Sequence, residues 1–121
     1  TWTRHPGNPL IRNGHNGAPD ARFASDPVVV KHRGEWGMFY FGRANDGPCR
    51  ELLALGRTPT RFAKVDEVLI DIGAPGSIDE KFAHKPAVIY HDGALYHFYC
   101  AVSGKWPNDT RGLAVARSKP W

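Results

Sequence analysis

Two short segments of the chain repeat one pattern of carboxylates and cations, and they supply the candidates for chemistry. Residues 20–26 and 79–85 both read Asp-x-(Arg/Lys)-Phe-Ala-x-(Asp/Lys), and a proline follows each. Asp26, the last residue of the first segment, can act as a base or stabilise a developing positive charge. The structural alternative is that Asp26 caps a turn or pairs with Arg22.

The second segment differs from the first at the positions where chemistry is expected. His84 replaces a serine and can transfer a proton near neutral pH, although a turn histidine is the alternative. The cation of Lys85, beside it, favours the neutral imidazole. Glu80 replaces an alanine and is the third catalytic candidate, after Asp26 and His84.

Further residues in and near these segments are candidates for ligand contact. The two repeated aspartates favour a structural role, such as an Asx turn, because they do not change between the copies. The indole of Trp106 can stack on a ring of a ligand or pack its own loop. The predicted ligand contacts are Asp20, Arg22, Asp79, Lys81, Lys85 and Trp106.

No metal or cofactor site is predicted. His91 and His97 suggest a metal, but His32 repeats His91 at a strand end, and no third ligand follows at a recognisable spacing. No glycine-rich phosphate loop and no nucleophile-elbow motif is present.

An internal repeat positions these segments. Residues 20–40 and 79–99 align without a gap at an offset of 59, with nine of twenty-one positions identical. With one residue of slip, the match continues from residues 53–58 to residues 113–118. We expect one structural unit to occur twice.

Each copy is predicted to be an antiparallel meander of short strands. The first strands are the apolar, β-branched runs 27–31 and 86–90, and the second strands are 36–41 and 95–101. Arg33-Gly34 and Asp92-Gly93 mark hairpin turns between them. The third strands are 52–57 and 113–117, and residues 62–70 are a fourth, edge strand of the first copy.

The chain is predicted to be one domain, with repeat one at about 12–70 and repeat two at about 71–121. The second repeat lacks a fourth strand of its own, whereas residues 2–11 parallel residues 62–70 and are predicted to supply it. The predicted fold is therefore all-β, with two four-stranded antiparallel β-propeller blades. Two blades do not close a ring, so we expect a partial propeller or one completed by oligomerisation, as a dimer or a trimer.

Composition and charge restrict the classes of partner that we expect for the chain. The net charge is +4, but the basic residues are scattered and form no nucleic-acid motif. No apolar run is long enough for a membrane span. Neither a signal peptide nor a disulfide pattern is visible, which favours the cytoplasm without establishing it.

The segment from Ser25 to Gly42, Ser-Asp-Pro followed by an apolar strand and Gly-x-Trp-x-Met-Phe-Tyr-Phe-Gly, resembles a blade motif of five-bladed propeller glycosidases. These are glycoside hydrolase families 43 and 117 and related bacterial glycosidases. Residues 84–121, which end in Arg-Ser-Lys-Pro-Trp, resemble the last blade of such proteins.

This resemblance implies a carbohydrate ligand in a pocket on the propeller axis. Asp26 matches the Asp-Pro carboxylate of those families and would be a base or stabiliser. His84 stands at the place of the acid, whereas Lys85 departs from the pattern, because it replaces a second Asp-Pro acid. The function expected is a glycoside hydrolase-like unit that binds or hydrolyses a carbohydrate; the alternative is a non-catalytic carbohydrate-binding or assembly module.

Overall fold

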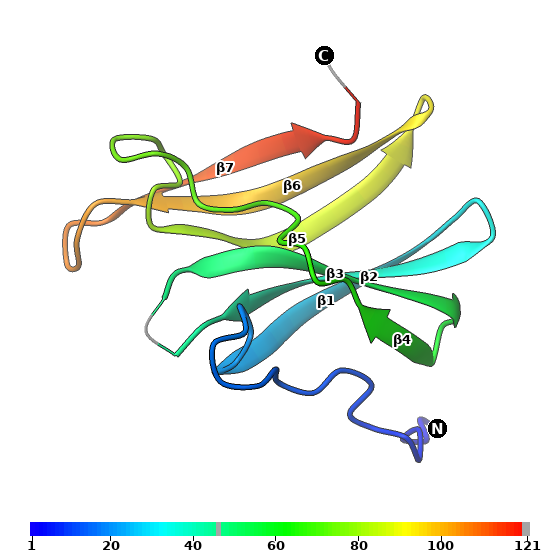
Figure 1. Cartoon of the computed structure of the whole chain (residues 1–121). Helices are drawn as coiled ribbons and strands as arrows, with labels where there is room; N and C mark the ends of the chain where they lie inside the picture. The colour runs from blue at the N-terminus through cyan, green and yellow to red at the C-terminus, as the bar shows by residue number, and fades with distance from the viewer. Residues whose placement is uncertain (46, 120–121) are drawn as a thin grey trace.

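The regular secondary structure of the chain consists of strands, as a computed structural model shows for residues 1–45 and 47–119 (Figure 1). No helix occurs among these residues. The strands are β1 (Phe23–His32), β2 (Glu35–Arg43), β3 (Cys49–Thr58), β4 (Arg61–Lys64), β5 (Phe82–His91), β6 (Ala94–Ser103) and β7 (Thr110–Arg117).

The strands form two antiparallel meanders. β1 to β4 pair in chain order, and so do β5 to β7. One parallel pair, Cys49 with Phe82, joins β3 to β5 and connects the two meanders. The prediction of an all-β fold made of two blades is confirmed. The predicted four strands are present in the first blade, whereas the described part of the second blade has three.

The β1–β2 and β5–β6 hairpins have the turns that the sequence predicts. Arg33 and Gly34 have φ values of 50° and 81°, and Asp92 and Gly93 have φ values of 45° and 77°. Two successive residues with positive φ are the mark of a type I′ turn, whose twist matches that of the flanking strands. The chain therefore reverses direction in the same way after β1 and after β5, and pairs β1 with β2 and β5 with β6.

The repeat also includes the loops that lead into β1 and β5. The amide of Gly14 donates to the Asp20 carbonyl at 3.3 Å, and the amide of Gly73 donates to the Asp79 carbonyl at 3.2 Å. A Cβ at either glycine would collide with the aspartate side chain, so both positions require glycine. The loop before β1 and the loop before β5 therefore share one hydrogen-bonded conformation.

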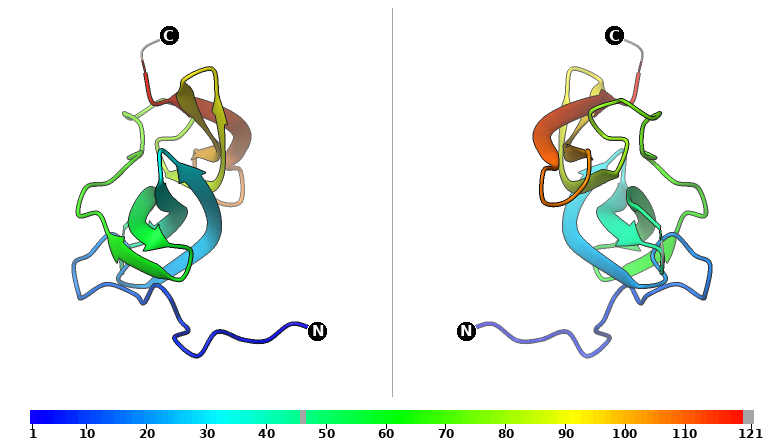
Figure 2. Two further views of the ribbon diagram at one scale, coloured as in Figure 1. Left: turned by 90° about the vertical axis from the view of Figure 1, so that its right-hand side faces the viewer. Right: turned by 90° about the vertical axis from the view of Figure 1, so that its left-hand side faces the viewer.

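Residues 2–11 lie on the side of the first repeat and form no strand there. Leu10 and Ile11 pack against its core of Met38, Tyr40, Leu52 and Ala54, while the residues before them extend away from the sheets (Figure 2). Within one chain they do not pair with β7, so the fourth strand of the second repeat stays a prediction for an assembled form.

The two repeats pack face to face. Phe39 of β2 is 6% exposed because it lies against the second repeat, with its ring centroid 5.6 Å from that of His97. Phe98 occupies the same position in the second repeat and is 42% exposed, since nothing in the described chain covers it. Equivalent phenylalanines thus face a neighbour in one repeat and solvent in the other.

This pair gives a direct test of the interface. We expect Phe39→Ala to lower the free energy of unfolding by about 3–5 kcal/mol, because it leaves a cavity between the repeats. Phe98→Ala should lower it by about 1 kcal/mol or less. Urea unfolding of both variants at the lowest usable protein concentration measures the difference. Equal losses would show that the two rings are equally buried and contradict the packing described.

Candidate functional site

Residues 20–26 and 79–85 lie at the end of the sheets where β1, β3, β5 and β7 begin, on the left in Figure 1. The first strands begin earlier than predicted, at Phe23 and Phe82, so the last four residues of each segment belong to β1 and β5. In each segment the ladder is interrupted by a bulge, between Ser25 and Val28 and between His84 and Ala87. Proline in the bulge supplies no amide for the ladder. These bulges shape the candidate site.

Asp26 and Lys85 occupy the same backbone position in the two bulges. Their φ values are 51° and 63°, in the left-handed region that residues other than glycine rarely adopt. Both side chains are exposed. Bulges redirect side chains next to functional sites, and here the same distortion presents a carboxylate in one repeat and an ammonium group in the other.

His84 lies buried beside this exposed pair. Its side chain packs edge-on against Phe41 of the first repeat, at 5.3 Å between ring centroids, and against Phe82, at 5.7 Å. Burial lowers the pKa of His84, the cations of Lys85 and Arg111 lower it further, and Asp26 opposes them. The predicted effect of Lys85 is correct in sign, but burial is the larger cause. His84 is therefore neutral near neutral pH, and its Nε2 has no hydrogen-bond partner within the described chain.

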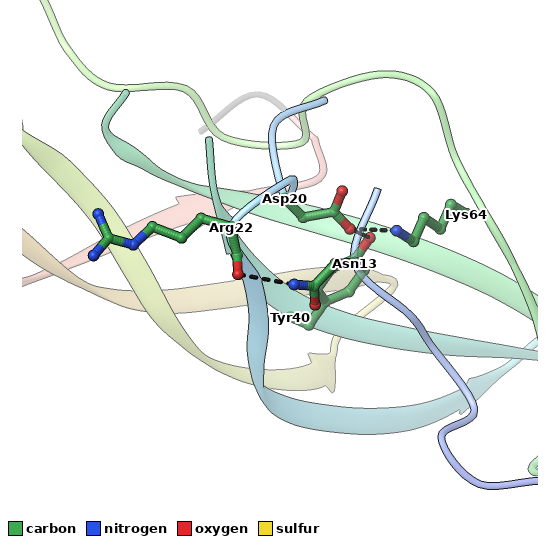
Figure 3. A network of polar contacts seen from close by, with 5 residues as sticks. All are labelled: Asn13, Asp20, Arg22, Tyr40 and Lys64. Atoms are coloured by element: carbon green, nitrogen blue, oxygen red, sulfur yellow. Dashed lines mark hydrogen bonds and ion pairs between the residues drawn. The ribbon is translucent and has the colours of Figure 1, made fainter. Parts of the chain in front are cut away.

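Asp20 and Asp79 each connect a loop to a strand. The Tyr40 hydroxyl donates to Asp20 at 3.2 Å and the Lys64 ammonium at 2.5 Å (Figure 3). The Tyr99 hydroxyl donates to Asp79 at 2.8 Å. Burial, followed by the bond to Asp79, raises the pKa of Tyr99 to about 12. This geometry supports the structural role that the sequence favours for both aspartates.

The backbone of Arg22 belongs to the same scaffold. Its backbone carbonyl accepts a hydrogen bond from the side-chain amide of Asn13 at 2.8 Å (Figure 3). Its backbone amide donates to the Arg43 carbonyl at 2.9 Å. The Arg22 side chain is exposed. In the second repeat, Lys81 lies with its ammonium 5.4 Å from the ring centroid of Phe82, and Arg43 approaches the same ring at 5.5 Å.

Glu80 is held by backbone rather than directed at a ligand. Its carboxylate accepts the amide of Gly76 at 2.6 Å and the amide of Gly104 at 2.9 Å. These two bonds lower the pKa of Glu80, which disfavours proton donation. Gly104 begins the loop of Trp106, whose side chain is 77% exposed. Through its bond to Gly104, Glu80 thus stabilises the start of the loop that carries the exposed indole of Trp106.

Sequence reasoning missed a buried pair at the junction of the repeats. Glu51 of β3 is 0% exposed, and its Oε2 lies 3.4 Å from Nε2 of His97 on β6. Burial raises the pKa of Glu51; His97 opposes the shift and Asp26 adds to it. The signal available in the sequence was a carboxylate in phase with Leu53 and Leu55, which marks Glu51 as inward-facing.

The described residues contain no group of three or more His, Cys, Asp or Glu side chains arranged to hold a metal ion. In the same part of the chain, no helix has the length and hydrophobicity needed to cross a membrane.

Comparison with solved structures identifies the kind of protein that shares this fold. The chain is similar to the structure of a complex of BT0996 with RGII, with 33% identity and a TM-score of 0.75 over 99% of this chain and 33% of the other. It is similar to a glycoside hydrolase, with 34% identity and a TM-score of 0.75 over 100% of this chain and 33% of the other.

A more distant likeness shows the fold alone. Zg3597, a family 117 glycoside hydrolase of the marine bacterium Zobellia galactanivorans, matches 90% of this chain at 17% identity, with a TM-score of 0.78 over 33% of its own length. No protein-family model and no curated protein matches the chain. The predicted glycosidase-like propeller fold is thus confirmed, and the chain spans about a third of the length of these solved structures.

The buried Glu51 makes a testable contribution to stability. A carboxyl whose pKa is raised in the folded state stabilises the fold below its unfolded pKa, and this contribution is lost as pH rises through the folded pKa. Glu51→Gln removes the charge but keeps the shape. We therefore expect its free energy of unfolding, relative to wild type, to increase as pH rises above 4.5, the ordinary pKa of a glutamate.

Thermal or urea unfolding between pH 4 and 8 measures this difference. Glu35→Gln, which makes the same substitution at an exposed position, is the matched control. If Glu51→Gln instead becomes less stable relative to wild type as pH rises, the attraction between Glu51 and His97 outweighs the burial of the carboxylate, contrary to our expectation.

Proposed function

We propose that this chain is a glycoside hydrolase-like propeller unit that binds a carbohydrate where β1 and β5 begin and takes part in its hydrolysis. The observation that carries the proposal is the likeness, at 33–34% identity over essentially the whole chain, to the two solved structures described above, one a glycoside hydrolase and one a complex with RGII. The exposed Asp26 and the neutral, unpartnered His84 lie together at that end.

The two side chains suit different tasks. Asp26 offers an exposed carboxylate that can act as a base or stabilise an oxocarbenium-like transition state. His84 is mostly neutral because burial lowers its pKa, so it is better suited to a hydrogen bond with a sugar hydroxyl than to storing a proton. Trp106 provides an exposed ring that can stack on a sugar face.

One observation favours the alternative, a carbohydrate-binding module without catalysis. Glycoside hydrolysis ordinarily uses two carboxyl groups. Lys85 stands at the position equivalent to Asp26, Glu80 is tied to two backbone amides, and Glu51 is fully buried. If the chain hydrolyses a glycoside, a second carboxyl group must come from elsewhere, and propeller blades supplied by other copies are the source we propose.

The role of Asp26 is tested by Asp26→Asn. In the enzyme, we expect kcat/KM on aryl glycosides to fall by about 10²-fold or more. Asp92→Asn is the matched control, because Asp92 is also an exposed aspartate with positive φ, but it lies in the turn between β5 and β6, at the other end of the strands. It should leave activity unchanged. Circular dichroism and unfolding confirm that both variants fold.

The outcomes separate the two functions. A fully active Asp26→Asn enzyme would remove Asp26 from the mechanism. Binding of an oligosaccharide by the wild type without turnover of any substrate in the panel would identify a binding module. Absence of both binding and turnover would contradict the carbohydrate proposal itself.

A further inference from the structure

The contact between the two repeats is formed by two surfaces, and each surface occurs a second time without its counterpart. The first surface carries Phe39 and Phe41 of β2. The second surface is the near face of the second repeat, where His97 lies 5.6 Å from Phe39 and His84 lies 5.3 Å from Phe41, between ring centroids. Because the chain contains two copies of one structural unit, each surface has an equivalent in the other repeat.

The equivalent of the first surface is uncovered. It is formed by β5, β6 and β7, and we call it the outer face of the second repeat. Phe98, at the position of Phe39, is 42% exposed, and Leu113, at the position of Leu53, is 88% exposed. Ile89 and Val115 are exposed beside them. Exposed apolar side chains gathered on one sheet face indicate an interaction surface.

The equivalent of the second surface contains an apolar hollow of about 220 Å³. It lies on the first repeat and is lined by Leu10, Ile11, Ala24, Ser25, Pro27, Met38 and Tyr40. Ser25 and Met38 stand at the positions of His84 and His97, the two side chains that contact Phe41 and Phe39 within the chain. The hollow is thus in the place where the second repeat receives the first.

We propose that a second copy of this chain docks the outer face of its second repeat onto the hollow of the first repeat. Phe98 of one copy would occupy the hollow beside Met38 of the other, as Phe39 packs beside His97 within one chain. The two surfaces differ, so the contact is head-to-tail and leaves one unused surface on each copy of a pair, which allows a closed ring.

The N-terminal segment adds a second contact in this arrangement. β4 pairs with β3, and after it Ile70 packs on the core of the second repeat. Leu10 and Ile11 stand at the positions of Leu69 and Ile70 and pack on the core of the first repeat. In the docked pair, residues 2–9 would therefore lie along the free edge of the other copy's β7 and provide the missing fourth strand.

The first test is the mass in solution as a function of concentration, by sedimentation equilibrium. We expect a mass above that of the monomer, corresponding to a dimer, a trimer or a longer array. A chain that stays monomeric at high micromolar concentration would overturn the proposal. This conclusion would hold even if a further repeat of a longer protein covers the outer face instead.

Two variants test the head-to-tail geometry. Leu113→Glu places a charge on the outer face, and Ser25→Arg fills the hollow; each should weaken self-association at least tenfold. Mixing them should restore a dimer of one copy of each, because each keeps the surface that the other has lost. Ile78→Glu, which alters an exposed side chain on the loop before β5, is the matched control and should leave the mass unchanged.

The mixing result decides the geometry. If Leu113→Glu and Ser25→Arg are both folded by circular dichroism and still fail to associate when mixed, the head-to-tail contact is wrong. If Ser25→Arg fails to fold, Leu10→Glu replaces it, since Leu10 lines the same hollow from a loop rather than from a strand.

Discussion

The packing of the first repeat against the second is the contact on which the rest of the structure depends. It buries Phe39 and Phe41 against His97 and His84, and it removes Glu51 from water. Burial is the largest influence on the protonation of His84 and Glu51, because it lowers the pKa of His84 and raises that of Glu51. The same contact thus stabilises the fold and disfavours charge on His84 and Glu51.

Much of the fold follows from the sequence because its determinants are local or repeated. The offset of 59 residues identifies two units, and Arg33-Gly34 and Asp92-Gly93 identify their hairpins. The fourth strand of the first repeat is less regular than predicted. β4 ends at Lys64. The Val65 amide still donates to the Leu53 carbonyl at 2.9 Å, and the chain then returns to β3 at Leu69 and Ile70, which both bond to Glu51. Polar residues between these points, such as Asp66 and Glu67, do not sustain a regular ladder.

The candidate site was less predictable because its contacts join segments that are distant in the sequence. Glu80 was a reasonable acid by residue type, but the amides of Gly76 and Gly104 occupy its carboxylate, and a one-dimensional pattern does not reveal such partners. Glu51 and His97 meet only because the two repeats pack together. Comparison of the repeats identified the segments that vary, whereas only the fold shows which side chains are tied to the scaffold.

Asp26 and Lys85 share one strained backbone conformation, so the strain belongs to the blade and not to catalysis. What distinguishes the site is the combination of side chains at a junction, since Asp26 comes from the first repeat and His84 from the second. A junction between two copies would instead combine Lys85 with Ser25, because these residues stand at the equivalent positions. Carboxylate and imidazole are therefore neighbours only at the junction within one chain, and the contact that we propose between copies would not duplicate that pair.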